Sequence, residues 1–144
     1  MTNTPTFLVA TDFSRSSQAA IDHAATHALL AGAKLLIVHV APVPSIDAGE
    51  GLLHRGAEPA DFAALERELQ AIRPAEVELE HLLLRGDPAE QILELAEARG
   101  VGLIVMGTNG RSGLLRALLG SVAESVLQSA SCPVLTLRIP EALS

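Results

Sequence analysis

Short apolar runs alternate with longer amphipathic runs along this chain. Runs with the length of buried strands lie at Thr6–Thr11, Lys34–Val40, Gly102–Gly107 and Pro133–Ile139. A fifth run, Val77–Leu83, alternates apolar residues with glutamates, which predicts a strand with one solvated face at a sheet edge. The pattern therefore predicts five strands separated by other elements.

Between these strands, apolar residues recur every three or four positions, which is typical of amphipathic helices. The first helix is expected to start at the N-cap Ser14 and to end at Gly32. The second is expected to end before Pro74, and the third to start at the N-cap Asp87. The fourth is expected to take Ser121 as its N-cap. On the first helix the predicted buried face is Ser17, Ala20, Ile21, Ala24, Ala25, Ala28 and Leu29.

Strands that alternate with helices predict a parallel sheet with helices on both faces. At 144 residues the chain is expected to be one α/β domain, residues 1–144, with its core between residues 6 and 139. The segment 41–59 loses all periodicity and is rich in proline and glycine, so we expect a flexible loop or a partly ordered lid there.

Composition narrows the class of protein. The formal net charge of −7 argues against non-specific binding of nucleic acid, which needs a basic footprint. We find no apolar stretch of 18 residues and no signal peptide at the N-terminus, so we expect no membrane span and a cytoplasmic protein. The single cysteine, Cys132, excludes an internal disulfide and suits a small buried apolar role.

The strand at Gly102–Gly107 ends abruptly in small and polar residues. Gly107 and Gly110 allow close approach of the backbone, and Gly120-Ser121 opens a helix whose first amides favour an anion. These features outline a phosphate site, although strand, turn and capped helix are also ordinary α/β connections. The pattern is neither a Walker A motif nor the G-x-G-x-x-G dinucleotide fingerprint.

The spacing of these glycines is more specific than their number. The motif consists of Gly107, two residues, Gly110, nine residues and then Gly120-Ser121. It resembles the G-x2-G-x9-G-(S/T) ATP-binding signature of the universal stress protein family. The resemblance extends from Thr6 to Ile139. It includes the segments Ala10-Thr11-Asp12-Phe13-Ser14, Val38-His39-Val40 and Cys132-Pro133-Val134-Leu135. One departure is Ala10, where members of that family often carry proline.

The resemblance implies an adenine nucleotide alpha hydrolase-like fold with the strand order 3-2-1-4-5. Strands 1 and 4 are then neighbours, and ligands of such sheets bind at this switch point, beyond the carboxyl ends of the strands. The resemblance also implies ATP binding and a homodimer that pairs through the last strand, residues 134–139. The candidate nucleotide-contacting residues are Ala10, Asp12, Val40, Met106, Gly107, Gly110, Arg111, Gly120, Ser121 and Val122.

Each candidate has a structural alternative. Asp12 is also a favourable residue at a helix start, Val40 is also a core residue, and Arg111 in a polar loop is also a solvated side chain. A basic spot near the phosphates would draw on Arg111, Arg116 and Arg15. A helix terminus contributes at most about 2 kcal/mol, whereas micromolar binding needs about 8. Burial of the base, several backbone hydrogen bonds and Mg²⁺ are therefore expected to contribute the remainder.

The histidines give no metal signature. His23 and His27 are spaced as in a zinc helix, but the glutamate of that motif is absent and both are expected to be solvated. His39 is expected to be a satisfied core residue at a strand end. We predict no metal site made of protein side chains and no catalytic residue, because no G-x-S-x-G elbow is present. Two alternatives to an ATP-binding regulatory dimer stay open: a slow ATP hydrolase, and a dimeric interaction module that has lost the nucleotide.

Overall fold

The structure, a computed structural model, describes residues 4–41, 45–47, 52–54, 59–74, 76–108 and 120–138. Its centre is a five-stranded parallel sheet of β1 (Thr6–Ala10), β2 (Lys34–Ala41), β5 (Leu79–Arg85), β6 (Leu103–Gly107) and β7 (Val134–Leu137). The strands lie in the order β5-β2-β1-β6-β7, which is 3-2-1-4-5 in chain order among these five. The predicted fold and strand order are confirmed.

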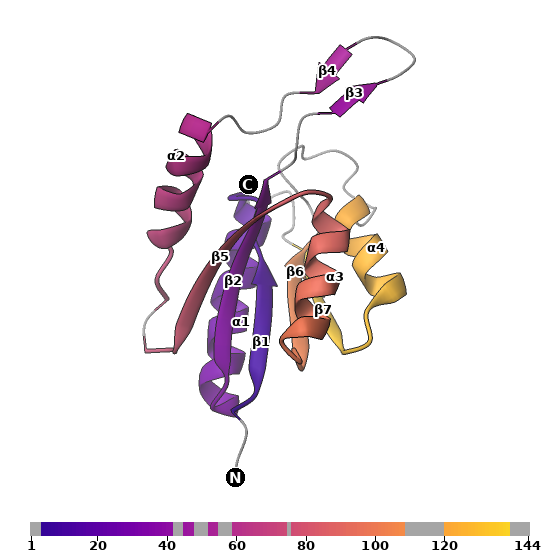
Figure 1. Cartoon of the computed structure of the whole chain (residues 1–144). Coiled ribbons are helices and arrows are strands. Elements are labelled where there is room, and N and C mark those ends of the chain that lie inside the picture. Colours follow the sequence, from indigo (N-terminus) through magenta and orange to yellow (C-terminus); the bar gives the residue numbers. More distant parts are fainter. Residues whose placement is uncertain are drawn as a thin grey trace.

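Two layers of helices cover the sheet (Figure 1). Helix α1 (Arg15–Ala31) and helix α2 (Pro59–Gln70) pack on one face, and α3 (Pro88–Ala98) and α4 (Ser121–Ser129) pack on the other. Strand residues alternate between the two layers: Leu8 and Ile104 contribute to the core under α3 and α4, whereas Val9 and Val105 contribute to the core under α1 and α2. The central strands β1, β2 and β6 are therefore buried on both faces, whereas the residues of the edge strands β5 and β7 are partly or fully exposed.

Local sequence explains where the helices begin and end. The Ser14 side chain accepts a hydrogen bond from the Ser17 amide at the start of α1, and Gly32 ends that helix with a φ of 66°. The Asp87 side chain accepts from the Glu90 amide at the start of α3, with Pro88 in the first turn. Both predicted N-caps and the predicted glycine stop are confirmed.

Several details differ from the prediction. The edge strand is Leu79–Arg85, two residues later than predicted, because the register is set by pairing with β2. Leu29 was expected on the buried face of α1 but is 51% exposed, since the small residues before it complete the contact with the sheet. The last strand runs from Val134 to Leu137, and Ile139 lies outside the described residues.

The segment expected to be a loop contains regular structure. Strand β3 (Ser45–Asp47) pairs antiparallel with β4 (Leu52–His54), so a short hairpin lies within the segment predicted as a loop or a partly ordered lid. The hairpin follows β2 and lies beyond the carboxyl ends of the sheet strands (Figure 1). Its mobility stays a prediction.

Within the described residues, no helix combines the length and apolar character that crossing a membrane requires.

Candidate functional site

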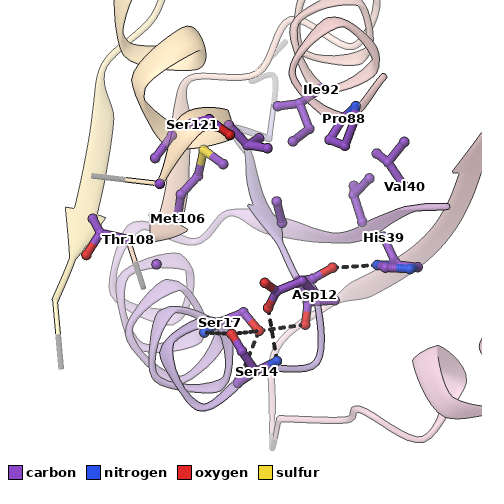
Figure 2. A pocket seen from close by; sticks show the side chains of 17 residues that line it. Asp12, Ser14, Ser17, His39, Val40, Pro88, Ile92, Met106, Thr108 and Ser121 are labelled. Atoms are coloured by element: carbon purple, nitrogen blue, oxygen red, sulfur yellow. Dashed lines mark hydrogen bonds between the residues drawn. The ribbon is translucent and has the colours of Figure 1, made fainter. Parts of the chain in front are cut away.

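A pocket of about 250 Å³ opens at the carboxyl ends of β1, β2 and β6 (Figure 2). Helix α1, which follows β1, covers one face of the sheet, and α4, the next described helix after β6, covers the other. The pocket therefore lies at the topological switch point, the place where open parallel sheets bind ligands.

The structure brings together the predicted contact residues that it describes. The following line this one pocket: Ala10, Asp12, Val40, Met106, Gly107, Gly120, Ser121 and Val122. They come from the ends of three strands and from the start of α4, which are far apart in the sequence. Gly110, Arg111 and Arg116 lie outside the described residues.

One wall of the pocket is apolar. Val40 comes from β2, Met106 from β6, and Pro88 and Ile92 from the first turns of α3. Figure 2 shows Val40, Pro88 and Ile92 grouped on one side, with Met106 beside Ser121. Such a wall favours a flat apolar group such as a nucleobase.

The opposite wall is the turn between β1 and α1, which is rich in hydrogen bonds. The Ser14 amide donates to Asp12 Oδ1 at 3.0 Å, and the Phe13 amide donates to Thr11 Oγ1 at 3.0 Å. Thr11 Oγ1 and Ser17 Oγ are 3.0 Å apart, and the Ser17 hydroxyl donates to the Ser14 carbonyl at 3.0 Å. These bonds hold the backbone of the turn and place the Asp12 carboxylate at the pocket (Figure 2).

The start of α4 forms the third side of the pocket. Its N-cap is Gly120, with φ −63° and ψ 150°, and Ser121 is the first helical residue. The prediction of Ser121 as N-cap is wrong, because the extended N-cap conformation is that of Gly120, and Ser121 is already helical. The first amides of a helix have no acceptor within the helix, and Ser121, Val122 and Ala123 line the pocket. This end of the pocket suits an anion.

The two described glycines of the motif serve the packing of the protein. A Cβ on Gly107 would lie 2.7 Å from the carbonyl carbon and oxygen of Ser16, at the start of α1. A Cβ on Gly120 would lie 3.1 Å from the Thr108 carbonyl oxygen, which accepts the Gly120 amide at 2.9 Å. We predicted Gly107 as a close approach to a ligand, whereas the structure explains it by the close approach of α1 to β6.

Several residues that line the pocket were not proposed as contacts from the sequence. They are Thr11, Ser14, Ser17, Val38, His39, Pro88, Ile92, Thr108 and Ala123. Ser14 and Pro88 were identified only as helix-start residues. They line the pocket because α1 and α3 both begin at the carboxyl ends of the sheet strands, where the pocket opens. Pro88 and Ile92 reach the pocket through the packing of α3, for which the sequence carries no local signal.

Charged side chains are few around the pocket. Among the lining residues that the structure describes, Asp12 is the acidic one and none is a lysine or arginine. Arg15 is exposed and does not line the pocket, and its part in a basic spot near the phosphates stays a prediction. No group of three or more metal-ligating side chains occurs in the described parts of the chain. His23 and His27 are both exposed, as predicted.

Taken together, the fold and the pocket define a single-domain, parallel α/β protein with a ligand pocket at its switch point. The model of the universal stress protein family matches residues 4–138. The chain belongs to this family.

Individual relatives agree with this assignment. The chain is 34% identical to a Bacillus subtilis universal stress protein, YxiE, over 91% of this chain and 97% of that protein. It is 38% identical to a Thermus aquaticus universal stress protein, over 92% of this chain and 98% of that one. A shorter match to the Methanocaldococcus jannaschii universal stress protein MJ0531 is 54% identical, but covers 41% of this chain and 35% of that protein.

Solved structures share the fold. UspA from Lactobacillus plantarum has a TM-score of 0.71 at 22% identity, covering 96% of this chain and 100% of that one. The universal stress protein from Archaeoglobus fulgidus, in complex with dAMP, has a TM-score of 0.66 at 26% identity, covering 94% and 98%. A universal stress protein in complex with cAMP has a TM-score of 0.62 at 27% identity, covering 95% and 98%.

Proposed function

We propose that this protein binds ATP, together with Mg²⁺, in the pocket at the carboxyl ends of β1, β2 and β6. The observation that carries the proposal is the convergence of predicted nucleotide-contacting residues from separate segments on one pocket. Relatives of the same fold have been solved with the adenine nucleotides dAMP and cAMP. The nucleotide acts as a regulatory ligand of a stress-response protein rather than as a substrate.

The chemistry of the walls assigns a place to each part of the nucleotide. The adenine lies against the apolar wall of Val40, Pro88 and Ile92, and the Asp12 carboxylate accepts hydrogen bonds from the base or the ribose. The phosphates lie toward the first amides of α4. A volume of about 250 Å³ is just below the range that encloses a drug-sized ligand, so we expect part of the nucleotide to extend beyond the pocket.

Magnesium fits this arrangement as a partner of the phosphates. Mg²⁺ commonly binds through one or two carboxylates together with phosphate oxygens and water. Since the described lining offers no lysine or arginine, the ion, held by phosphate oxygens and water, would neutralise the charge of the triphosphate. We therefore expect ATP to bind more weakly when the magnesium is removed with a chelator, and adenosine to bind equally with or without it.

The phosphate position is tested by Ser121→Pro. Gly120 already has the extended backbone that a residue before proline adopts, and proline is well tolerated as the first helical residue. The substitution removes one amide donor from the helix start while preserving the helix. Hydrogen bonds to charged groups contribute about 1.5–3 kcal/mol, so we expect a loss of ATP affinity of roughly tenfold or more by calorimetric titration.

Ser121→Ala is the matched control, because it removes the hydroxyl and retains the amide. We expect Ser121→Ala to bind ATP nearly as well as the wild type, and both variants to bind adenosine with unchanged affinity. If Ser121→Pro remained folded, by circular dichroism, and bound ATP as tightly as Ser121→Ala, the phosphates would not lie at the start of α4.

A further inference from the structure

We infer that His39 is a positioning residue of this pocket, which holds the Thr11–Asp12 turn in the conformation that receives the nucleotide. The inference rests on the proposed function, and it adds to that function a residue that does not itself contact the ligand in our account. His39 lies near the end of β2, and the turn follows β1, the neighbouring strand.

The contact between His39 and the turn is short and has a defined direction. His39 Nδ1 lies 2.7 Å from the carbonyl oxygen of Thr11 (Figure 2). A carbonyl oxygen can only accept, so Nδ1 carries the proton and donates it. The bond is a second attachment of the turn to β2, beside the backbone bond from the Thr11 amide to the Val38 carbonyl at 2.8 Å.

The turn has a conformation that needs such support. Phe13 has a φ of 65°, in the left-handed region that non-glycine residues seldom adopt. The His39 ring packs against the Phe13 ring, with a centroid distance of 4.6 Å and an interplanar angle of 48°. One side chain therefore binds the residue before Asp12 through a hydrogen bond and the residue after it through ring packing.

The same turn sets the orientation of the Asp12 carboxylate. Asp12 Oδ1 accepts from the Ser14 amide at 3.0 Å, so the carboxylate follows the backbone of residues 12–14. The Thr11 side chain is tied to the Phe13 amide and to Ser17. Movement of the Thr11 carbonyl would be transmitted through these bonds to Asp12 and to the pocket wall.

Three substitutions of His39 separate the hydrogen bond from the bulk of the ring. His39→Asn keeps an N–H donor at the position of Nδ1, one bond beyond Cγ. His39→Gln moves the donor one bond further out, and His39→Leu keeps apolar bulk without a donor. In His39→Leu the Thr11 carbonyl loses the His39 donor, which costs free energy, so the turn is expected to move. Because that movement reaches Asp12 and the pocket wall, we expect this variant to bind ATP and adenosine about tenfold more weakly. His39→Asn should recover most of the affinity, and His39→Gln less.

A double-mutant cycle with Asp12→Ala tests whether His39 acts through Asp12. If it does, His39→Leu reduces ATP affinity in the wild-type protein but has little further effect in the Asp12→Ala protein. Additive losses, or equal affinities of the Asn and Leu variants, would overturn the inference. Should His39→Leu fail to fold, the comparison of His39→Asn with His39→Gln still decides the matter.

The protonation of the ring is measured separately, on the nucleotide-free protein, by ¹⁵N NMR of the imidazole. We expect the proton on Nδ1, and finding it on the other ring nitrogen in the neutral ring would overturn the inference. If the wild-type protein showed the Nδ1 proton but bound neither ATP nor adenosine, the proposed function would fail while the His39–Thr11 contact would stand. The two failures are therefore distinguishable.

Discussion

At the scale of single residues, the glycines show that a residue singled out by a motif can have a second physical cause. Gly107 was predicted from its spacing, and the structure places it at the pocket. A side chain there would collide with the backbone of Ser16, so the glycine is required by the packing of α1 on β6 even without a ligand. A ligand-binding defect in a Gly107 variant would therefore not by itself identify the site.

This packing predicts a graded effect of alanine substitutions. Gly107→Ala should lower the free energy of unfolding by about 2 kcal/mol, as overpacking does, and Gly120→Ala should cost less, since its Cβ would lie 3.1 Å from Thr108 oxygen. Gly102→Ala is the control, because its Cβ would lie 4.0 Å from the nearest atom, Thr6 oxygen. Urea denaturation measures all three. Equal stability of the Gly107 and Gly102 variants would show that α1 is not packed this closely.

The remaining pocket residues show where prediction from the sequence ended. Asp12 and Val40 were predicted because each ends a strand and because the family resemblance, which also implied the strand order, places both beside the nucleotide. The hydrogen bonds among Thr11, Ser14 and Ser17, and the contact of His39 with Thr11, depend on the conformation of one turn with a positive φ at Phe13. No periodic pattern encodes that conformation, so these contacts could be found only in the structure.

At the scale of the elements, strands and helices were predictable because burial on both faces produces continuous apolar runs and amphipathic helices. The ends were less predictable, since they depend on neighbours. The edge strand β5 is shifted by two residues, and the N-cap of α4 is Gly120 instead of Ser121. At each of these two boundaries the local sequence allows more than one end residue, and pairing or packing with another element determines which one is used.

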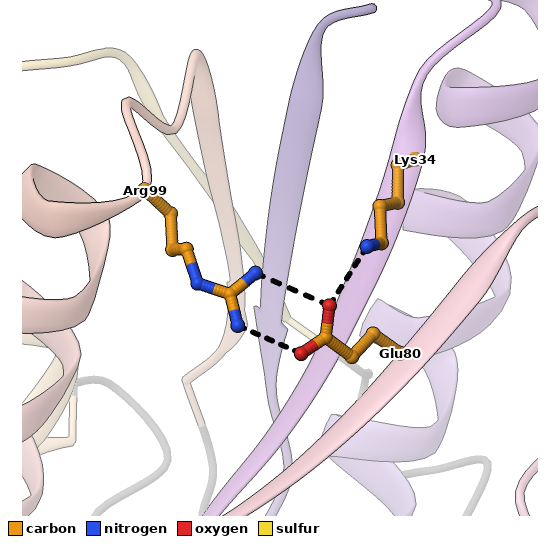
Figure 3. A network of polar contacts seen from close by, with 3 residues as sticks. All are labelled: Lys34, Glu80 and Arg99. Carbon is orange, nitrogen blue, oxygen red and sulfur yellow. Dashed lines mark hydrogen bonds and ion pairs between the residues drawn. The ribbon is translucent and has the colours of Figure 1, made fainter.

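An ion-pair network connects three elements at the end of the sheet opposite the pocket (Figure 3). Glu80 of β5 binds Arg99, at the end of α3, with Nη2–Oε2 2.7 Å and Nη1–Oε1 3.1 Å. It also binds Lys34, at the start of β2, with Nζ–Oε1 2.7 Å. We expected Glu80 on a solvated face, whereas it links the edge strand β5 to β2 through Lys34 and to the end of α3 through Arg99.

The network makes stability depend on pH. Hydrogen bonds from Arg99, and then from Lys34, lower the pKa of Glu80 from its ordinary 4.5 to about 2. Because the folded-state pKa is depressed, the stabilisation is present above pH 4.5 and is lost as the pH falls toward 2. The Glu80 side chain is 30% exposed, so solvent screening limits the contribution to about 1 kcal/mol.

Glu80→Gln should therefore be about 1 kcal/mol less stable than the wild type at pH 7, with a difference that shrinks as the solution is acidified through pH 4.5 toward pH 2. Urea denaturation at several pH values measures it. Glu78→Gln, at an exposed position just before β5, is the control and should show no such trend. A difference that stayed constant down to pH 2 would exclude ionisation of Glu80 as its cause.

At the scale of the whole molecule, the strand order puts β1 beside β6 and so positions the pocket. It also leaves β5 and β7 as the two edges of the sheet. In the described residues, β7 pairs only with β6. The Ile104 and Thr108 amides donate to the carbonyls of Pro133 and Leu137, so the backbone groups of Val134 and Thr136 face away from β6. An edge of this kind is suited to pairing with a second chain, and we propose that two copies pair there.

Thr136→Pro tests this pairing, since it removes an outward-facing amide and leaves the inward-facing groups of β7 in place. We expect the wild type to have twice the chain mass of 15.0 kDa by light scattering, and Thr136→Pro to have the mass of one chain. Thr136→Val, which retains the amide, should remain a dimer. A wild-type monomer, or a Thr136→Pro dimer, would contradict pairing through β7.

The central claim is that an adenine nucleotide occupies the pocket at the switch point. Titration of the ¹⁵N-labelled protein with magnesium ATP, followed through its amide resonances, tests the claim most directly. We expect saturable shifts, largest at Asp12, Val40 and Ser121 around the pocket, and small shifts at Lys34 and Glu80 at the far end of the sheet. Saturable shifts centred on that far end, or no saturable shifts, would contradict the account.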